Sequence, residues 1–573
     1  MPTLSARMPD AANPLIVQSD RTLLLETLNP RFAAARDALA MFAELVKSPD
    51  YMHTYRISPL SLWNAAAAGH TADEIIGCLH EYAKYPIPEN ILIQIREDIS
   101  RYGRLRLEVD EASGQLRLVA SDAPLMREVE AQRAVQPYIE SRVDDTTLLI
   151  RPDARGWIKQ ALIKIGYPVE DLAGYMAGEH LAIALRETAA CGKPFTLRAY
   201  QTEAADIFHA AGSVRGGSGV IVLPCGAGKT IIGIAAIARL QMHVLVLTTN
   251  ITSLHQWRDE LLDKTTIPAD QIGEYSGERK SIRPITLTTY QILTHRRRRE
   301  EDFAHLDLFQ AQNWGLIIYD EVHLLPAPIF RAVADIQAKR RLGLTATLVR
   351  EDGKEDDVFS LIGPKRYDVP WKQLEQQGWI AEAQCTEIRI PLAEELRLPY
   401  ATADAKAKFR ISSENPKKLE VMDRLLTAHA GDHVLVIGQY LDQLEIIRER
   451  TGAPIITGKT PTREREDLYA RFKQGEIKVL IVSKVANFAV DLPDANVAIQ
   501  VSGTFGSRQE EAQRLGRILR PKSAGKQAHF YSLVTKDSRD QDFAMNRQLF
   551  LTEQGYRYTI QIENDGNGKS ATA

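Results

Sequence analysis

The chain has 573 residues and a formal net charge of -3 at pH 7, with 44% hydrophobic and 25% charged residues. That length is too great for one hydrophobic core, so we expect several domains in a globular protein of ordinary composition. The first residues lack the basic and apolar blocks of a secretory signal, and no apolar run is long enough to span a bilayer. These features predict a cytoplasmic protein with no membrane contact.

The four cysteines, Cys78, Cys191, Cys225 and Cys385, are scattered along the chain. Zinc and iron–sulfur sites need clustered thiolates, so the spacing predicts neither a zinc site nor an iron–sulfur cluster. The slightly negative total charge argues against a polyanion bound over the whole surface. Any nucleic-acid site must therefore be a local groove.

Residues 1–122 predict a small α+β domain. Apolar residues recur at helical spacing over 34–48, and residues 61–85 indicate two helices separated at Gly69. Residues 104–121 indicate a hairpin that turns near Gly114. A second small domain is expected over 123–194.

From residue 195 onward, short continuous apolar runs alternate with helical stretches. Strands of a parallel sheet show such runs because helices cover both faces of the sheet. The fold class is therefore α/β, with two tandem domains over 195–365 and 366–560 and a disordered polar tail over 561–573. The predicted strands are 219–223, 243–249, 284–290, 315–320, 342–347, 433–438, 477–483, 496–502 and 529–534.

A glycine loop follows the first of these runs, in the segment VIVLPCGAGKT (220–230). Glycines let the backbone close around phosphate oxygens, and the following helix N-terminus adds positive potential. Lys229 is expected to reach the β and γ phosphates of ATP, and Thr230 to hold Mg²⁺. The first glycine of the general pattern is replaced by Leu223. The predicted nucleotide-binding residues of this loop are Gly226, Ala227, Gly228, Lys229 and Thr230.

Two carboxylates end the strand GLIIYD (315–320) and begin the segment DEVH (320–323). Asp320 is expected to hold Mg²⁺, and Glu321 to orient and deprotonate the attacking water. An acidic strand end is common in α/β folds, but the glycine loop upstream favours the catalytic interpretation.

Three arginines, Arg514, Arg517 and Arg520, share one face of a helix at their spacing in QRLGRILR (513–520). Arg517 and Arg520 are candidates for arginine fingers that stabilise charge on the γ-phosphate in the transition state. In that case ATP would lie between two domains, and hydrolysis would drive their motion.

The order of these three motifs resembles that of superfamily 2 helicases and translocases. Further segments agree with it, namely RAYQ (198–201), TTYQIL (288–293), TAT (345–347) and DLPDANVAIQ (491–500). The resemblance implies nucleotide contacts from Gln201, which would read adenine, and from Asp491. It also implies that ATP hydrolysis is coupled to nucleic acid through His323, Thr345, Thr347 and Gln513.

Longer segments resemble the XPB (xeroderma pigmentosum group B) DNA helicase family and suggest a prokaryotic member. They include LGLTATLVRED (342–352), FSLIGPKRYDVPW (359–371), GWIAEAQCTEI (378–388) and EEAQRLGRILRPK (510–522). The resemblance is dense over 195–560 and extends into the N-terminal domain. It implies two RecA-like domains, with a thumb-like insertion at about 395–418 in the second and residues 123–194 in the place of a damage-recognition domain. Residues 486–489 depart from the family pattern.

In this family the sequence Arg-Glu-Asp after the TAT motif is a signature implicated in opening DNA, and Arg350, Glu351 and Asp352 match it. The resemblance therefore implies an ATP- and Mg²⁺-dependent 3′ to 5′ DNA helicase that acts on single strands or forks in DNA repair. A nuclease or another repair protein is the implied protein partner.

Three alternatives stay open at this point. A duplex DNA translocase that does not separate strands is the nearest, and an RNA helicase is the second, since ATPase motifs do not report the sugar. A non-catalytic scaffold clamped by ATP is the third. The presence of Lys229, Glu321, Arg517 and Arg520 argues against the scaffold.

Overall fold

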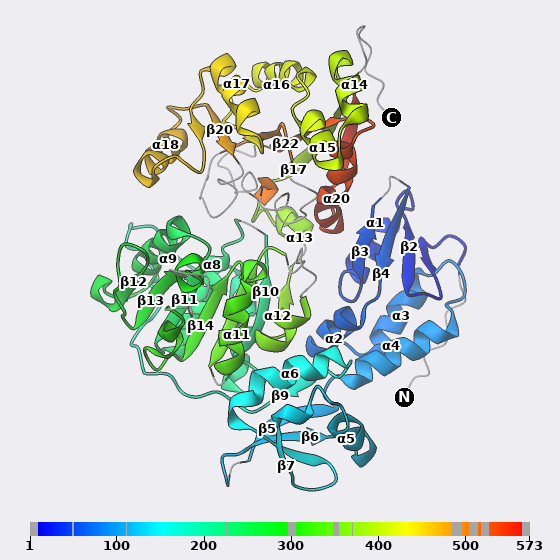
Figure 1. The fold of residues 1–573 in the computed structure, drawn as a ribbon, viewed down its shortest axis with the longest axis vertical. Helices are drawn as coiled ribbons and strands as arrows, with labels where there is room; N and C mark the ends of the chain where they lie inside the picture. The colour runs from blue at the N-terminus through cyan, green and yellow to red at the C-terminus, as the bar shows by residue number, and fades with distance from the viewer. Residues whose placement is uncertain are drawn as a thin grey trace. The chain divides into compact units, whose positions relative to one another are not determined.

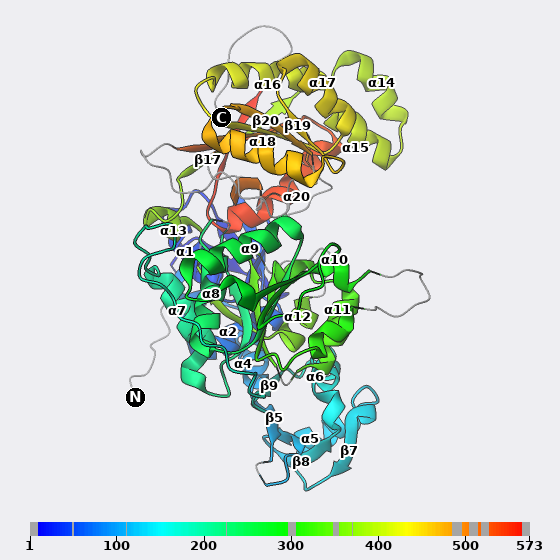
Figure 2. The same ribbon diagram turned by 90° about the vertical axis from the view of Figure 1, so that its left-hand side faces the viewer.

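The computed structural model describes residues 10–48, 51–110, 112–224, 226–295, 305–337, 339–347, 355–369, 371–483, 495–503, 511, 514–516 and 527–563. The chain divides into two compact units. The first unit contains Met1–Leu223 and Gly228–Asp368, and the second contains Pro224–Ala227 and Val369–Ala573. Figures 1 and 2 draw the ribbon from two sides. Within the described ranges, no helix combines the length and the apolar character needed to cross a membrane.

A parallel sheet of seven strands forms the centre of the first unit, in the order β12-β13-β11-β14-β15-β10-β16. The strands are β10 (Ser218–Val222), β11 (Val244–Thr248), β12 (Ile272–Tyr275), β13 (Ile285–Thr289), β14 (Leu316–Asp320), β15 (Arg340–Thr345) and β16 (Lys365–Asp368). The helices around it are α7 (Ala199–His209), α8 (Lys229–Leu240), α9 (Ile251–Lys264), α10 (Tyr290–Leu293), α11 (Ala327–Asp335) and α12 (Glu355–Leu361).

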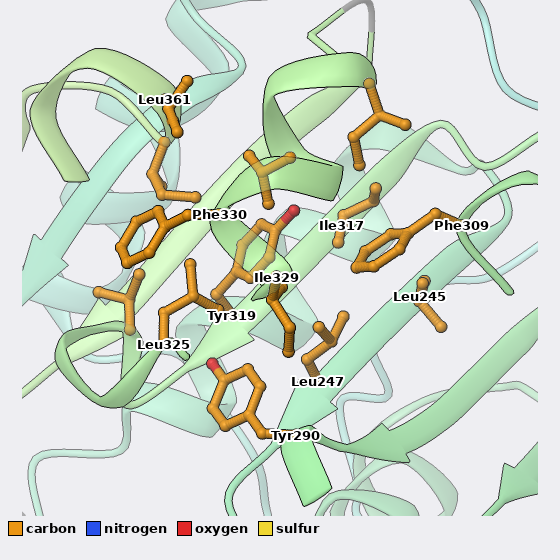
Figure 3. Close-up of a cluster of buried hydrophobic side chains, with 14 of the residues drawn as sticks. Leu245, Leu247, Tyr290, Phe309, Ile317, Tyr319, Leu325, Ile329, Phe330 and Leu361 are labelled. Carbon is orange, nitrogen blue, oxygen red and sulfur yellow. The ribbon is translucent and has the colours of Figure 1, made fainter. Parts of the chain in front are cut away.

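The two faces of this sheet are covered by different helices. Strand residues Leu245, Ile317 and Tyr319 pack against Ile329 and Phe330 of α11, as Figure 3 shows. Helices α8 and α9 pack against β11, β13, β14 and β15. Burial on both faces explains why these strands are continuous apolar runs in the sequence.

A second parallel sheet of seven strands lies in the second unit, in the order β19-β20-β18-β21-β22-β17-β23. Its strands are β17 (Ala383–Ile390), β18 (Val434–Gly438), β19 (Ile455–Ile456), β20 (Val479–Ser483), β21 (Val497–Gln500), β22 (Ala528–Thr535) and β23 (Tyr558–Ile562). Its helices include α13 (Trp371–Gln376), α16 (Lys417–Ala428), α17 (Leu441–Thr451), α18 (Thr462–Gln474) and α20 (Arg539–Glu553). The predicted α/β class with two parallel-sheet domains is confirmed, and each of the nine predicted strands is present.

Strand β17 was not predicted from the sequence, although it lies inside the second sheet between β22 and β23. Its sequence, AQCTEIRI, mixes polar and apolar residues, so it does not form a continuous apolar run. Glu387 on this strand is 1% exposed, and its carboxylate accepts hydrogen bonds from Arg389 (2.6 Å) and Gln548 (2.6 Å). Paired charges can therefore occupy a buried strand that hydrophobicity alone does not reveal.

Two helices, α14 (Glu394–Thr402) and α15 (Ala405–Ser413), occupy the segment expected to form a thumb-like insertion. Phe409 of α15 is fully buried and makes an edge-to-face contact with Phe543 of α20, with ring centroids 4.9 Å apart. Leu398 on α14 is 74% exposed. The pair is therefore anchored to the second sheet domain through α15.

The N-terminal region begins with an antiparallel sheet in the order β1-β2-β4-β3. Its elements are β1 (Leu15–Val17), β2 (Thr22–Glu26), α1 (Phe32–Leu39), β3 (Glu44–Lys47), β4 (Met52–Arg56), α2 (Pro59–Ala67), α3 (Ala72–Tyr82) and α4 (Glu89–Arg101). The helix pair separated at Gly69 is confirmed, with that glycine at φ 96°. A helix over 34–48 was wrong in its second half, because Glu44–Lys47 pairs with β4 as a strand.

A five-stranded sheet in the order β7-β8-β6-β5-β9 follows. Its elements are β5 (Leu105–Val109), β6 (Leu116–Ala120), α5 (Ala123–Glu130), β7 (Ile139–Arg142), β8 (Thr147–Ile150), α6 (Arg155–Lys164) and β9 (Val169–Asp171). Strands β5 and β6 form the expected hairpin. The sheet crosses the domain boundary expected at residue 122, because one hydrophobic core joins the hairpin to β8 and α6.

Helix α6 attaches this five-stranded sheet to the first parallel-sheet domain, packing against α11 and α12 (Figure 1). At Gly156 an added Cβ would lie 2.4 Å from the carbonyl oxygen of Ala334, so only glycine permits this approach. The Lys159 ammonium donates to the Asp171 carboxylate (2.8 Å) and to the Gln337 side chain (2.5 Å). The Arg155 guanidinium also pairs with Asp171, at 2.8 Å.

Burial shapes the protonation of this cluster. It lowers the pKa of Lys159 to about 7, opposed by the Asp171 carboxylate. Burial alone would raise the pKa of Asp171, but the charges of Lys159 and Arg155 hold it well below its ordinary value. Asp171 is therefore ionised and balances the buried Arg155 guanidinium and the protonated form of Lys159.

Asp171→Asn should lower the free energy of unfolding by about 3–5 kcal/mol, because it leaves buried cations without their counter-ion. Urea unfolding followed by circular dichroism measures this change. The control is Asp145→Asn, since the Asp145 side chain is 85% exposed and pairs with Arg142 at the surface. Its effect should stay below about 1 kcal/mol. Equal effects of the two substitutions would contradict the role given to Asp171.

Candidate nucleotide-binding site

The loop between β10 and α8 has a backbone that favours glycine. Gly226 has a φ of 84° and Gly228 a φ of 81°, and both values lie in the left-handed region that favours glycine. A Cβ at Gly228 would lie only 2.6 Å from the Gln201 amide nitrogen, Nε2. Gly228 immediately precedes the first turn of α8, where backbone N–H groups point out of the helix end. This geometry suits a bound phosphate.

Gln201 is held beside this loop by helix α7, which packs against α8. Its side chain is 4% exposed, and its Oε1 accepts a hydrogen bond from the Arg198 backbone N–H at 3.0 Å. The structure thus brings Gln201 next to Gly228. Adenine recognition by Gln201 stays a prediction.

Lys229 occupies the first position of α8 and turns toward the strand ends. Its Nζ lies 3.4 Å from the Leu223 carbonyl oxygen and 3.5 Å from Glu321 Oε1. Thr230 follows it in the first turn of the same helix. The lysine and the predicted catalytic carboxylate are therefore in direct ionic contact.

Asp320 is the last residue of β14, and its carboxylate is held by a side chain that the sequence analysis did not assign to the site. The Trp257 indole N–H donates to Asp320 Oδ2 at 3.0 Å, and the Tyr290 hydroxyl donates to the Asp320 backbone oxygen at 2.8 Å. Burial, with the neighbouring charge of Glu321, raises the pKa of Asp320 to about 6.

Glu321 follows Asp320 with φ at 52°, a left-handed conformation that non-glycine residues seldom adopt and that is often found at functional sites. Burial alone would raise the pKa of Glu321, but the Lys229 ammonium and then His323 hold it below its ordinary value. The adjacent carboxylates therefore differ in character. Glu321 is the more readily ionised, as a proton acceptor requires.

His323 connects this acidic strand end to the next strand. Its Nδ1 lies 2.6 Å from Thr345 Oγ1 and 3.5 Å from Glu321 Oε2. The Thr345 hydroxyl donates its proton to the Thr347 carbonyl at 2.6 Å, so it must accept the bond from His323. Nδ1 of His323 therefore carries a proton, and one chain of contacts links Glu321, His323 and the TAT segment.

The donor set fits the metal that the sequence predicts. Mg²⁺ prefers oxygen ligands from carboxylates and hydroxyls, and Asp320 and Thr230 supply both kinds. Their elements, β14 and α8, are in contact within one unit. These two residues would hold the ion, whose charge would neutralise phosphate oxygens.

The first unit thus brings the following predicted site residues together at one end of its sheet: Gln201, Gly228, Lys229, Thr230, Asp320, Glu321, His323, Thr345 and Thr347. Arg514, in the second unit, is fully buried and donates to the Gln500 side chain, so it supports the fold of that unit. Several predicted residues lie outside the described residues: Arg350, Glu351, Asp352, Asp491, Gln513, Arg517 and Arg520.

Trp257 and Tyr290 contact Asp320 but were not predicted from the sequence as site residues. Tyr290 belongs to the TTYQIL segment, which the resemblance related to a strand-contact motif. Trp257 lies 63 residues before its partner Asp320. In the sequence it has the features of an ordinary core residue of an amphipathic helix.

Comparison with known protein families gives three matches along the chain. Residues 374–572 match the family described as ERCC3/RAD25/XPB C-terminal helicase. Residues 15–144 match a helicase conserved C-terminal domain, and residues 194–350 match the family described as type III restriction enzyme, res subunit.

Curated relatives match almost the whole chain. The DNA 3′-5′ helicase XPB of Kineococcus radiotolerans is 54% identical over 97% of this chain and 97% of its own length. The protein of the same name from Mycobacterium tuberculosis is 53% identical over 96% of this chain and 98% of its own. The general transcription and DNA repair factor IIH helicase/translocase subunit XPB/SSL2 of Saccharomyces cerevisiae is 32% identical, over 97% of this chain and 73% of its own length. These matches show that the chain belongs to the XPB family of DNA 3′-5′ helicases.

Proposed function

We propose that this protein is an ATP-driven DNA helicase that moves 3′ to 5′ along one strand and opens the duplex. The observation that carries the proposal is the contact between Lys229 and Glu321 beside Asp320, at the end of a glycine loop. Relatives that match the chain almost end to end, and whose names state a DNA 3′-5′ helicase, support it. A DNA substrate would also agree with the cytoplasmic location that the sequence predicts.

The loop amides and the N-terminus of α8 would hold the ATP phosphates. Lys229 would then move from Glu321 toward the β and γ phosphates, because their negative charge exceeds that of one carboxylate. Glu321, freed of that contact, would orient the attacking water and take its proton. Arg517 and Arg520 are assigned by the resemblance to stabilise transition-state charge.

The DNA contacts should be mostly to the backbone, so binding should depend little on sequence and strongly on salt. Arg350, Glu351 and Asp352 are assigned by the resemblance to strand opening, and α14 with α15 to the thumb-like insertion. A nuclease or other DNA-repair protein is the class of partner that the resemblance implies.

A duplex translocase without strand separation is the second candidate. The name of the yeast relative contains the words helicase/translocase subunit, which supports translocation as the alternative activity. In that case the same ATP site would drive movement along intact duplex, and a partner would separate the strands.

Strand displacement on DNA with a 3′ tail, a 5′ tail or blunt ends, and on matching RNA, tests the proposal. Displacement from the 3′-tailed DNA alone is the expected result. ATP hydrolysis stimulated by blunt duplex without displacement of any strand would replace the helicase with the translocase. Displacement of RNA only would overturn both.

Glu321→Gln should bind ATP but hydrolyse it at least about 100-fold more slowly, because the amide cannot accept the proton of the attacking water. Single-turnover hydrolysis and equilibrium nucleotide binding, measured side by side, check this. Glu97→Gln on the exposed face of α4 is the control and should hydrolyse ATP normally. Unchanged turnover in Glu321→Gln would remove this residue from the role of base.

Replacing Arg350, Glu351 and Asp352 together by alanine should leave hydrolysis without DNA unchanged and reduce strand displacement about tenfold or more. The reason is that the three side chains, by resemblance, contact DNA and not ATP. Parallel assays of ATP hydrolysis and displacement on the 3′-tailed substrate measure both effects. Normal displacement by the triple variant would refute the assignment.

A further inference from the structure

We propose that Trp257 is a positioning residue for the magnesium-binding carboxylate of the ATPase site. Its indole sets the orientation of Asp320 and the distance between that carboxylate and the helix that carries Lys229 and Thr230. The inference rests on the proposed function and adds a residue that the motifs do not contain.

The first observation is a specific hydrogen bond. Trp257 lies on α9 and is 1% exposed, and its Nε1–H donates to Asp320 Oδ2 at 3.0 Å. An indole can only donate, so the bond is strongest when the carboxylate is ionised, which is also the form that binds a metal ion. With the backbone oxygen of Asp320 held by Tyr290, the residue is fixed at both ends.

The second observation is a space in α8 that the indole fills. A Cβ at Gly233 would lie 2.4 Å from Trp257 Cη2 and 3.3 Å from a methyl group of Leu344. Gly233 is buried one helical turn after Lys229 and Thr230, so the ring is wedged against the same helix that begins at the phosphate loop. The indole therefore touches both halves of the predicted metal site, the helix with Thr230 and the strand end with Asp320.

Another tryptophan of the first unit shows what a purely structural indole does. Trp314 is fully buried in the hydrophobic core, and its Nε1–H donates to the Leu308 backbone carbonyl at 2.9 Å. A buried indole N–H needs an acceptor, and a nearby carbonyl is sufficient. Trp257 uses a site carboxylate instead, which points to a role beyond packing. Groups that hold metal ligands from behind commonly tune metal affinity.

Trp257→Phe removes the hydrogen bond to Asp320, and with it the distal ring atoms Cζ3 and Cη2 that lie against Gly233. We expect the Mg²⁺ concentration that gives half-maximal nucleotide binding to rise about tenfold or more. The readout is equilibrium binding of a fluorescent ADP analogue, titrated with Mg²⁺ and repeated in EDTA. Binding in EDTA should not change. The matched control is Trp314→Phe, which should leave the Mg²⁺ dependence as in the unaltered protein.

A second variant separates the hydrogen bond from the ring's shape. Benzothienylalanine at position 257 keeps a bicyclic ring and replaces the N–H by sulfur, and it should reproduce the shift in Mg²⁺ dependence. No shift with this residue in a folded protein would overturn the proposal, as would an equal shift in Trp314→Phe. Because the readout is nucleotide binding, it gives a result even if the protein fails to open DNA, and the two failures are distinguishable.

Discussion

The C-terminal ends of parallel strands all lie at the same edge of a sheet, and the ATPase site of this protein depends on this arrangement. In the first sheet β15 lies between β14 and β10, with Asp320 opposite Leu344 and Val222 opposite Thr345. Neighbouring strands are about 4.8 Å apart. The glycine loop, the two carboxylates and the TAT segment therefore meet within a distance that one triphosphate can span, although the loop ends at Thr230 and the carboxylates begin only at Asp320.

Charge at this edge is unevenly shared. Lys229 stabilises the ionised form of Glu321 directly, whereas Asp320 is buried beside another carboxylate and resists ionisation. Mg²⁺ would relieve the repulsion between the carboxylates, which is one reason such a site binds metal and nucleotide together. The indole of Trp257 favours the same ionised state of Asp320 from the other side. The left-handed backbone at Glu321 turns the chain so that successive residues face different partners.

Much of this could be predicted from the sequence, because both parallel sheets consist of continuous apolar runs and the phosphate loop has a fixed spacing. Elements without a continuous apolar run, and contacts between side chains far apart in the sequence, could not be predicted. Strand β17 is polar where Glu387 and Arg389 pair, and Glu44–Lys47 becomes a strand only beside β4. The contact of Trp257 with Asp320 and the sheet that joins β5 and β6 to β7, β8 and β9 are likewise long-range. No local pattern reports such contacts.

We propose that ATP chemistry at the sheet edge is transmitted to DNA through the contacts that join Glu321, His323 and the TAT segment, the coupling role that the resemblance implies for His323, Thr345 and Thr347. Thr345→Val removes the hydroxyl that joins His323 to Thr347 while keeping the side chain's shape. The most direct measurement is the number of ATP molecules hydrolysed per strand displaced from 3′-tailed DNA. We predict that nucleotide binding and DNA-free hydrolysis persist in this variant while the ATP consumed per displaced strand rises severalfold. If the number of ATP molecules hydrolysed per displaced strand does not change, the hydroxyl of Thr345 does not couple ATP hydrolysis to DNA opening.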